Sequence, residues 1–383
     1  MSDRALLRLG QLAVVLAGAL AVAVLATVPG DPEFGYDLDA YLGAADNLMA
    51  GLPYYPVPDA TGGITLGPAG IYPYPPVWTA AFVPLALLPR EAVHAAWFVG
   101  LIVLAAAVGV ALVRPLPVER RYWAAAAYLA YLPLLSEIRF GNLNLITLAL
   151  VLLAWNQRRR PALAGVLFAV AIGLKLLPLA LLAFLFIGGR WRVGAWAVGA
   201  FTLVVVFTWP WMGGAWIEYL GVLRAIGTGI PGAGSNIVPD EIIVTPLRYI
   251  GPFVAVGVAA LAGWGVRRHG RERLGFAVAL AMAPFVGTSV WYPYLVLALP
   301  LILGSDGGRP RPDEQERTPL VPRLVGWLAI EARLDPLPLV GLLLASISGL
   351  YALFRGERTE PVGERLAPVG GPASAEASGI EPT

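Results

Sequence analysis

The 383-residue chain lacks cysteine, holds only two histidines, His94 and His269, and has a single lysine among its 27 lysine and arginine residues. The absence of cysteine excludes disulfides, thiolate metal sites and cysteine nucleophiles. Two histidines are too few for a multi-histidine metal centre. A glycine-rich nucleotide motif is also missing. The sequence therefore predicts neither a metal ion nor a cofactor.

Charge is scarce as well, since 14% of the residues are charged and 58% are hydrophobic, with a mean hydropathy of +0.71. Long uncharged runs recur along nearly the whole chain, which predicts an all-α polytopic membrane protein. The net charge of +2 gives no reason to expect nucleic acid as a partner. The predicted spans lie near 6–28, 91–113, 122–138, 142–155, 161–174, 176–188, 193–209, 246–266, 274–288, 291–304 and 336–354.

Arginine clusters indicate the cytoplasmic ends of these spans, because cytoplasmic loops collect Lys and Arg. They precede the first span and recur at 114–121, 158–160, 190–192 and 267–273. Residues 29–76 carry six acidic side chains and no basic one. We therefore expect a first outer loop at 29–90 and a second at 209–245.

Two apolar stretches leave the topology partly open. Residues 77–89 form a helix of about 20 Å, which is short for a core of about 30 Å, so we interpret them as a membrane-lying helix of the outer loop. Whether 321–333 crosses, and hence the side of the C-terminus, stays undecided. Residues 1–355 form the predicted membrane domain. Residues 356–383, rich in Gly, Pro, Ser and Glu, form a predicted disordered tail.

The lone lysine, Lys175, interrupts the apolar run AIGLKLLPLA at 171–180. The topology places it near the outer end of a helical hairpin, where Pro178 begins the second helix. A charge inside a membrane is costly and usually faces a functional cavity. The alternative is that Lys175 snorkels to the outer headgroups.

The acidic loop contains an amphipathic helix within 35–56, with apolar residues at helical spacing and an end at Gly51 and Pro53. Its apolar face predicts a helix lying on the membrane. Asp37 stands at its start. Aspartate is a favoured N-cap, so capping and a catalytic role are both open for this residue, and the two are compatible.

Four motifs in this order resemble glycosyltransferase family 87, the polyprenyl-phosphate-mannose-dependent mannosyltransferases of the GT-C superfamily, over roughly residues 30–300. They are the helix with Asp37, Tyr41, Ala44, Gly51, Pro53 and Tyr54; Tyr74-Pro75-Pro76; Gly141-Asn142-Leu143-Asn144; and the pair Lys175 and Pro178. Where the family often has a tryptophan followed by histidine, this chain reads Trp291-Tyr292-Pro293-Tyr294.

The resemblance implies a GT-C-type fold with roughly 10–13 transmembrane helices in the cytoplasmic membrane and an extracytoplasmic active site. It also implies an inverting transfer of a sugar, mannose by analogy, from a polyprenyl-phosphate donor to a glycolipid or polysaccharide acceptor such as a lipoglycan. Membrane lipid is a further partner. By the same analogy Asp37 is the general base, with Asp39, on another face of the helix, in reserve.

Other polar groups at predicted outer helix ends complete the candidate site. Lys175, Arg139 and Arg248 are candidates for the donor phosphate, since arginine presents a planar fork to phosphate oxygens. Interface anchoring is the alternative for both arginines. The candidates for sugar or acceptor are Tyr41, Tyr74, Asn142, Asn144, Asn236, Trp291, Tyr292 and Tyr294. Helix capping for Asn142 and Asn144, and an aromatic membrane belt for 291–294, are the competing interpretations.

Two other function classes remain at this stage. A transporter or flippase would use Lys175 and Arg139 to bind an anionic substrate, but paired repeats with broken helices are not evident in the sequence. A non-catalytic assembly factor would not need Asp37 and Lys175 on the same side of the membrane. An enzyme is the favoured class, mainly through the resemblance.

The topology can be tested with single cysteines in this naturally cysteine-free chain. We expect Thr61→Cys to react with a membrane-impermeant maleimide in intact cells, because the acidic segment 29–76 lies outside. A cysteine placed within 158–160 should react only after lysis. Labelling of Thr61→Cys only after lysis would invert the predicted orientation.

Overall fold

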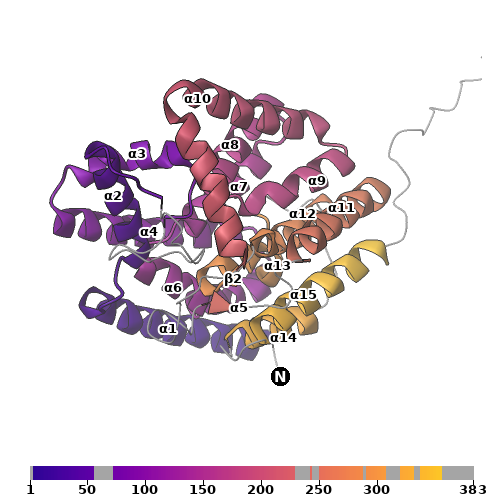
Figure 1. The fold of residues 1–383 in the computed structure, drawn as a ribbon. Helices are drawn as coiled ribbons and strands as arrows, with labels where there is room; N and C mark the ends of the chain where they lie inside the picture. Colours follow the sequence, from indigo (N-terminus) through magenta and orange to yellow (C-terminus); the bar gives the residue numbers. More distant parts are fainter. Residues whose placement is uncertain are drawn as a thin grey trace, which may run out of the picture.

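The computed structural model describes residues 3–55, 72–228, 242–243, 250–287, 290–307, 320–331 and 337–355. These residues are almost entirely helical (Figure 1). The elements in chain order, with η for 3₁₀ helices, are α1 (Asp3–Thr27), η1 (Val28–Gly30), α2 (Tyr36–Met49), α3 (Pro76–Ala86), α4 (Arg90–Val113), α5 (Val118–Leu129), α6 (Leu132–Phe140), α7 (Asn144–Asn156), α8 (Pro161–Leu174), η2 (Leu177–Leu179), α9 (Ala180–Ile187), α10 (Trp191–Thr228), β1 (Ile242–Ile243), α11 (Gly251–His269), α12 (Glu272–Ala281), η4 (Ala283–Val286), β2 (Val290–Trp291), η5 (Tyr292–Ala298), α13 (Leu299–Leu303), α14 (Leu320–Glu331) and α15 (Leu337–Phe354). The two short strands pair antiparallel.

The all-α membrane class predicted from the sequence is confirmed. Three described helices are long and apolar enough to cross a membrane, namely α1, α4 and the first 33 residues of α10. Helices α6 and α7 pass the same test together as a pair bent by 115°. The other apolar helices are shorter, so the predicted count of 10–13 crossings depends on how these short helices combine.

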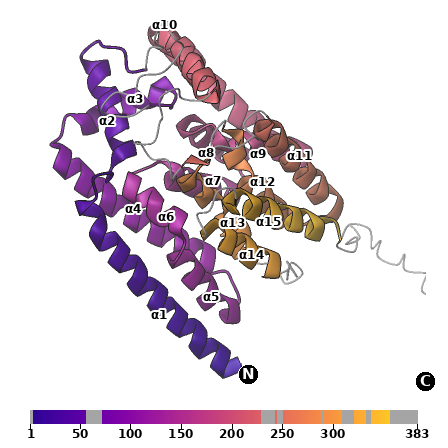
Figure 2. The ribbon, with the colours of Figure 1, turned by 60° about the horizontal axis from the view of Figure 1, so that its bottom comes forward.

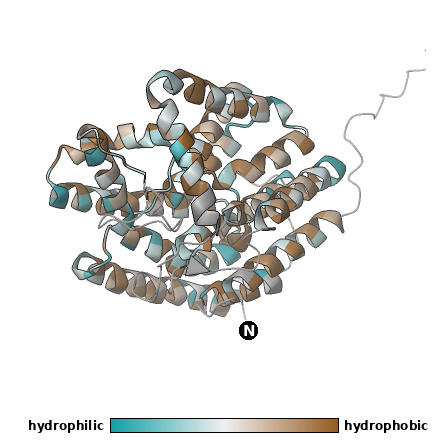
Figure 3. Ribbon diagram, in the orientation of Figure 1, coloured by the Kyte–Doolittle hydropathy of each residue, from teal (hydrophilic) through white to brown (hydrophobic). Residues whose placement is uncertain are grey.

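The long helices carry exposed apolar side chains on their outer faces. Figure 2 shows α1 as a long rod along one side of the molecule, and it packs against α5. Only 11% of the apolar window of α1 is buried, and Figure 3 shows apolar residues along its length. An apolar face that contacts no protein is what a helix in lipid requires.

Glycines allow the inner helices to approach closely. A Cβ on Gly165 of α8 would lie 2.3 Å from the Cβ of Trp196 on α10. A Cβ on Gly263 of α11 would lie 2.7 Å from the carbonyl oxygen of Phe184 on α9. Small residues at such contacts are typical of membrane helix packing, where van der Waals contact replaces the hydrophobic effect.

Two sequence-based boundaries differ from the structure. The expected span 122–138 is divided into α5 and α6, because Pro133 in the first turn of α6 prevents a continuous helix. The expected second outer loop, 209–245, is helical up to Thr228. Pro210 does not end α10 but lies within it, and Figure 1 shows the helix as two limbs that meet at an angle. Residues 229–241 and 244–245 of this loop, and the tail 356–383, lie outside the described residues.

Helix α2 was expected to lie on the membrane with its apolar face in lipid, but this face is buried inside the protein. Leu38, Tyr41, Leu42 and Ala45 are at most 1% exposed, and α2 packs against α3. The reason is that α3 and the surrounding tyrosines form a second hydrophobic core that takes up this face. Helix α3 has 11 residues, or about 16 Å, so it is too short to cross, as expected for 77–89. The α2–α3 unit therefore covers one end of the bundle.

Candidate active site

A cluster of buried polar side chains lies where α2, α6, α7 and α8 meet. Its members are Asp37, Glu137, Asn142, Asn144 and Lys175, and we call it the polar cluster. Each of these side chains is at most 7% exposed. Such a concentration of buried charge is rare outside functional sites because burying a charge is costly unless it is paired.

Gly141 creates the turn that presents Asn142 to the cluster. It ends α6 with a φ of +69°, a left-handed conformation that glycine adopts at little cost. The close surroundings also favour glycine, since an added Cβ would lie 3.1 Å from the Cβ of Leu38. The indole of Trp97 donates a hydrogen bond of 2.9 Å to the Gly141 carbonyl. Packing against Leu38 and the hydrogen bond from Trp97 therefore both hold this turn in place.

Lys175 is positioned by a break between two helices. Its backbone is extended, with φ −154° and ψ 128°, directly after the last residue of α8. The chain resumes as the 3₁₀ helix η2, with Pro178 in its first turn. This break places the lysine inside the protein, 6% exposed, rather than at the lipid surface. The snorkelling alternative is thus not what the structure shows.

The amide of Asn142 connects the carboxylate and the ammonium group. Its nitrogen donates to Oδ2 of Asp37 at 2.5 Å, and its oxygen accepts from Nζ of Lys175 at 2.9 Å. The same oxygen accepts from the backbone N–H of Leu143 at 2.6 Å and from Nδ2 of Asn144 at 3.0 Å. A base candidate and a cation therefore stand one amide apart.

Asp37 is not in the N-cap position. Gly35 occupies it, so Asp37 lies in the first turn of α2. An anion there is stabilised by the positive end of the helix dipole. Asp39 lies on another face, 45% exposed, with Oδ1 2.9 Å from Nε2 of His94. The structure thus places Asp37 in the polar cluster and Asp39 outside it.

Glu137 is the cluster member that sequence analysis missed. It is fully buried in α6, and it accepts from Nδ2 of Asn144 and from the backbone N–H of Leu145, both at 2.8 Å. A carboxylate inside a predicted membrane span was the available signal. Because the predicted span 122–138 ends one residue later, Glu137 was treated as an ordinary polar residue at a helix end.

Tyrosines close the apolar side of the cluster. Tyr41 is fully buried and donates to the hydroxyl of Tyr74 at 2.9 Å. Nζ of Lys175 lies 3.5 Å from that hydroxyl and 4.0 Å from the ring centre of Tyr294. An ammonium over an aromatic face is stabilised by the ring's quadrupole. Tyr41, Tyr74 and Tyr294 are thus part of the site.

The remaining candidates are not brought to Lys175. Arg139 pairs with Asp31 at 2.9 Å and Glu33 at 2.6 Å. Burial raises the pKa of Asp31, but hydrogen bonds from Arg139 and from the Glu33 backbone N–H, together with the charge of Arg139, lower it more, so the net pKa is below its usual value. Tyr292 donates to the Ile330 carbonyl, and Trp291 belongs to strand β2. Arg248 and Asn236 lie outside the described residues.

Comparison with known proteins identifies relatives. The sequence model of glycosyltransferase family 87 matches residues 72–300, which include Asn142 and Lys175 and begin after Asp37. A polyprenol-phosphate-mannose-dependent alpha-(1-2)-phosphatidylinositol pentamannoside mannosyltransferase of Mycolicibacterium smegmatis is 30% identical over 324 residues, 77% of this chain and 76% of the relative. A polyprenol-phosphate-mannose-dependent alpha-(1-2)-phosphatidylinositol mannoside mannosyltransferase of Mycobacterium tuberculosis is 26% identical over 331 residues, 78% of this chain and 76% of the relative. No solved structure matches the chain.

The role of Glu137 in holding the site can be tested by thermal unfolding in detergent. Glu137→Leu leaves the amide of Asn144 and the N–H of Leu145 without this acceptor, at about 1–3 kcal/mol each. We expect the unfolding temperature to fall by at least roughly 5 °C. Glu137→Gln keeps an acceptor oxygen and should lose less than half as much. The exposed Glu91→Leu is the matched control, and equal unfolding temperatures for it and Glu137→Leu would contradict the role.

Proposed function

Because the chain belongs to glycosyltransferase family 87 and is a membrane glycosyltransferase, we propose that it transfers mannose from polyprenyl-phosphate-mannose to a glycolipid of the phosphatidylinositol mannoside class. Family membership decides against the transporter alternative. The single observation that supports the proposed reaction most directly is the Asn142 amide that joins Asp37 to Lys175. We further propose that this site opens to the outer face of the membrane.

Asp37 acts as the general base in the proposed reaction. The acceptor hydroxyl oxygen attacks the anomeric carbon while its proton moves to the Asp37 carboxylate. The bond between the anomeric carbon and the phosphate oxygen breaks, and its electron pair leaves with polyprenyl phosphate. A single displacement without a covalent intermediate inverts the anomeric configuration.

Lys175 stabilises the charge that develops on the leaving phosphate. A fixed cation in a site with little water acts strongly on such charge. Asn142 also bonds to both charged groups at once, because its oxygen accepts a hydrogen bond from the ammonium group and its nitrogen donates one to Asp37. Tyr74 and Tyr294 leave the lysine few other directions in which to move.

The base is tested by Asp37→Asn in membranes supplied with a radiolabelled polyprenyl-phosphate-mannose. The variant's amide oxygen still accepts from Asn142, so we expect folded protein. The proton acceptor is lost, and we expect a rate about 10²- to 10⁴-fold lower.

Asp39→Asn is the matched control, because it makes the same change two residues away outside the polar cluster. We expect its turnover to stay within a few-fold of wild type. Comparable activity of Asp37→Asn and wild type would remove Asp37 from the mechanism.

The cation is tested by Lys175→Met and Lys175→Arg. Methionine has a similar volume, and its flexible apolar side chain can fill the same buried space. The Asn142 oxygen keeps its two other donors, so Lys175→Met should remain folded. Donor binding and turnover should both fall, since the cation stabilises the phosphate in the ground state and more strongly in the transition state.

Lys175→Arg keeps the charge but replaces a point-like donor by a planar fork, so we expect partial activity. The measurement is turnover against donor concentration in purified, folded protein. Normal donor kinetics for Lys175→Met would show that the lysine is structural and would leave Asp37 to be judged separately.

A further inference from the structure

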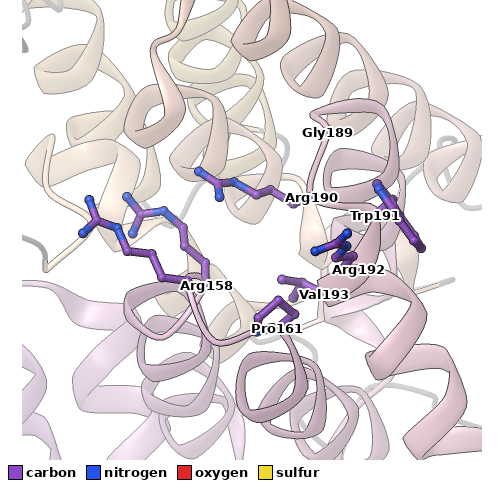
Figure 4. A pocket seen from close by; sticks show the side chains of 8 residues that line it. Arg158, Pro161, Gly189, Arg190, Trp191, Arg192 and Val193 are labelled. Carbon is purple, nitrogen blue, oxygen red and sulfur yellow. The ribbon is translucent and has the colours of Figure 1, made fainter.

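A second charged site lies at the other end of α8. It is a pocket of about 460 Å³ lined by Arg158, Arg159 and Pro161 at the start of α8 and by residues 189–193 at the start of α10 (Figure 4). Helix α8 has 14 residues, which separates this arginine pocket from Lys175 by about 20 Å. The pocket is therefore distinct from the polar cluster.

Positive charge exceeds negative charge in the arginine pocket. Glu272 accepts from Arg158 at 3.1 Å and also from Arg190. Arg159 and Arg192, the other two arginines of the lining, have no carboxylate within ion-pair distance among the described residues. One glutamate thus faces four arginines, and the surplus favours an anion.

Two helices begin at the arginine pocket and add to the positive potential. Pro161 opens α8, and Trp191 opens α10. The first N–H group that bonds to an earlier carbonyl is that of Ala164 in α8 and that of Val193 in α10. The backbone N–H groups before these residues therefore have no partner within the helix. Free N–H groups together with the helix dipole attract phosphate groups. Arginine forks bind phosphate through paired hydrogen bonds, which makes a phosphate group the best match.

The position of the arginine pocket also indicates where the phosphate comes from. The apolar helices α7, α8, α9 and α10 all end or begin there, so the pocket lies at a membrane boundary. Trp191, 57% exposed and part of the lining, matches the aromatic residues of that boundary. The arginine clusters assign this boundary to the cytoplasmic face, where anionic lipids gather.

We propose that the arginine pocket binds the phosphate group of an anionic phospholipid of the cytoplasmic leaflet. The headgroup phosphate accepts from Arg159 and Arg192, while Arg158 and Arg190 stay paired with Glu272. The lipid connects the turn before α8 to the first turn of α10, two helices that already pack closely through Gly165. This site needs neither sugar donor nor turnover, so it stands independently of the proposed reaction.

The test uses full-length protein, delipidated in a neutral detergent and titrated with phosphatidylglycerol, with bound lipid counted by native mass spectrometry. We expect wild type to hold one phosphatidylglycerol in preference to phosphatidylcholine. The double variant Arg159→Gln/Arg192→Gln should bind it at least roughly tenfold more weakly, because two charge-assisted contacts are lost.

The double variant Arg114→Gln/Arg120→Gln is the matched control, because it removes two exposed arginines from another predicted cytoplasmic loop. It should bind phosphatidylglycerol as wild type does. Equal binding by wild type and Arg159→Gln/Arg192→Gln would overturn the proposal, and so would an equal loss in the control variant. Displacement of the lipid by inorganic phosphate at matching concentration would overturn the lipid as the source of the phosphate.

Discussion

The burial of one ammonium group is the constraint that organises this end of the molecule. A lysine removed from water needs hydrogen-bond acceptors and nearby negative charge, or its burial opposes folding. Asn142 provides the acceptor, Tyr74 and Tyr294 provide aromatic faces, and Asp37 and Glu137 provide the charge. These groups come from five separate segments, so the lysine's requirements fix how those segments meet.

Broken helices are what make this meeting possible. A continuous membrane helix uses all of its backbone polar groups internally and offers only side chains to a site. Here α6 ends at Gly141 and α8 ends at Lys175, while α2 begins after Gly35. The backbone groups that lose their helical partners at these breaks form other hydrogen bonds. The Leu143 N–H donates to the side chain of Asn142, and the Gly35 N–H donates to the Arg139 carbonyl. The short helices are therefore a consequence of building a polar site at membrane depth.

The sequence revealed those features that depend on local chemistry. Composition predicted the all-α membrane class, and the lone lysine in an apolar run indicated where the site lies. The N-cap interpretation of Asp37 was wrong because Gly35, with a φ of +76°, takes the cap position. Arg139 was a candidate for the donor phosphate, and the structure pairs it with Asp31 and Glu33, which are 108 and 106 residues away in sequence. Glu137 was overlooked because its contacts depend on the 115° bend between α6 and α7, which the sequence analysis did not predict. The partners of Arg139 lie far away in the chain, so no local window of sequence predicts them.

The charge of the polar cluster fits the proposed reaction in one further respect. Two buried carboxyl groups and one ammonium group surround the position that an anionic donor would enter. In the proposed transfer, Asp37 would receive a proton while the leaving phosphate gains an electron pair, so one negative charge would disappear as another forms. Asn142 bonds to both Asp37 and Lys175, and in the proposed reaction the lysine turns its hydrogen bond toward the phosphate as the carboxylate is neutralised. In this proposal the Asn142 amide, which bonds to both groups, lets the single lysine of the cluster change partner without leaving the neighbourhood of the base.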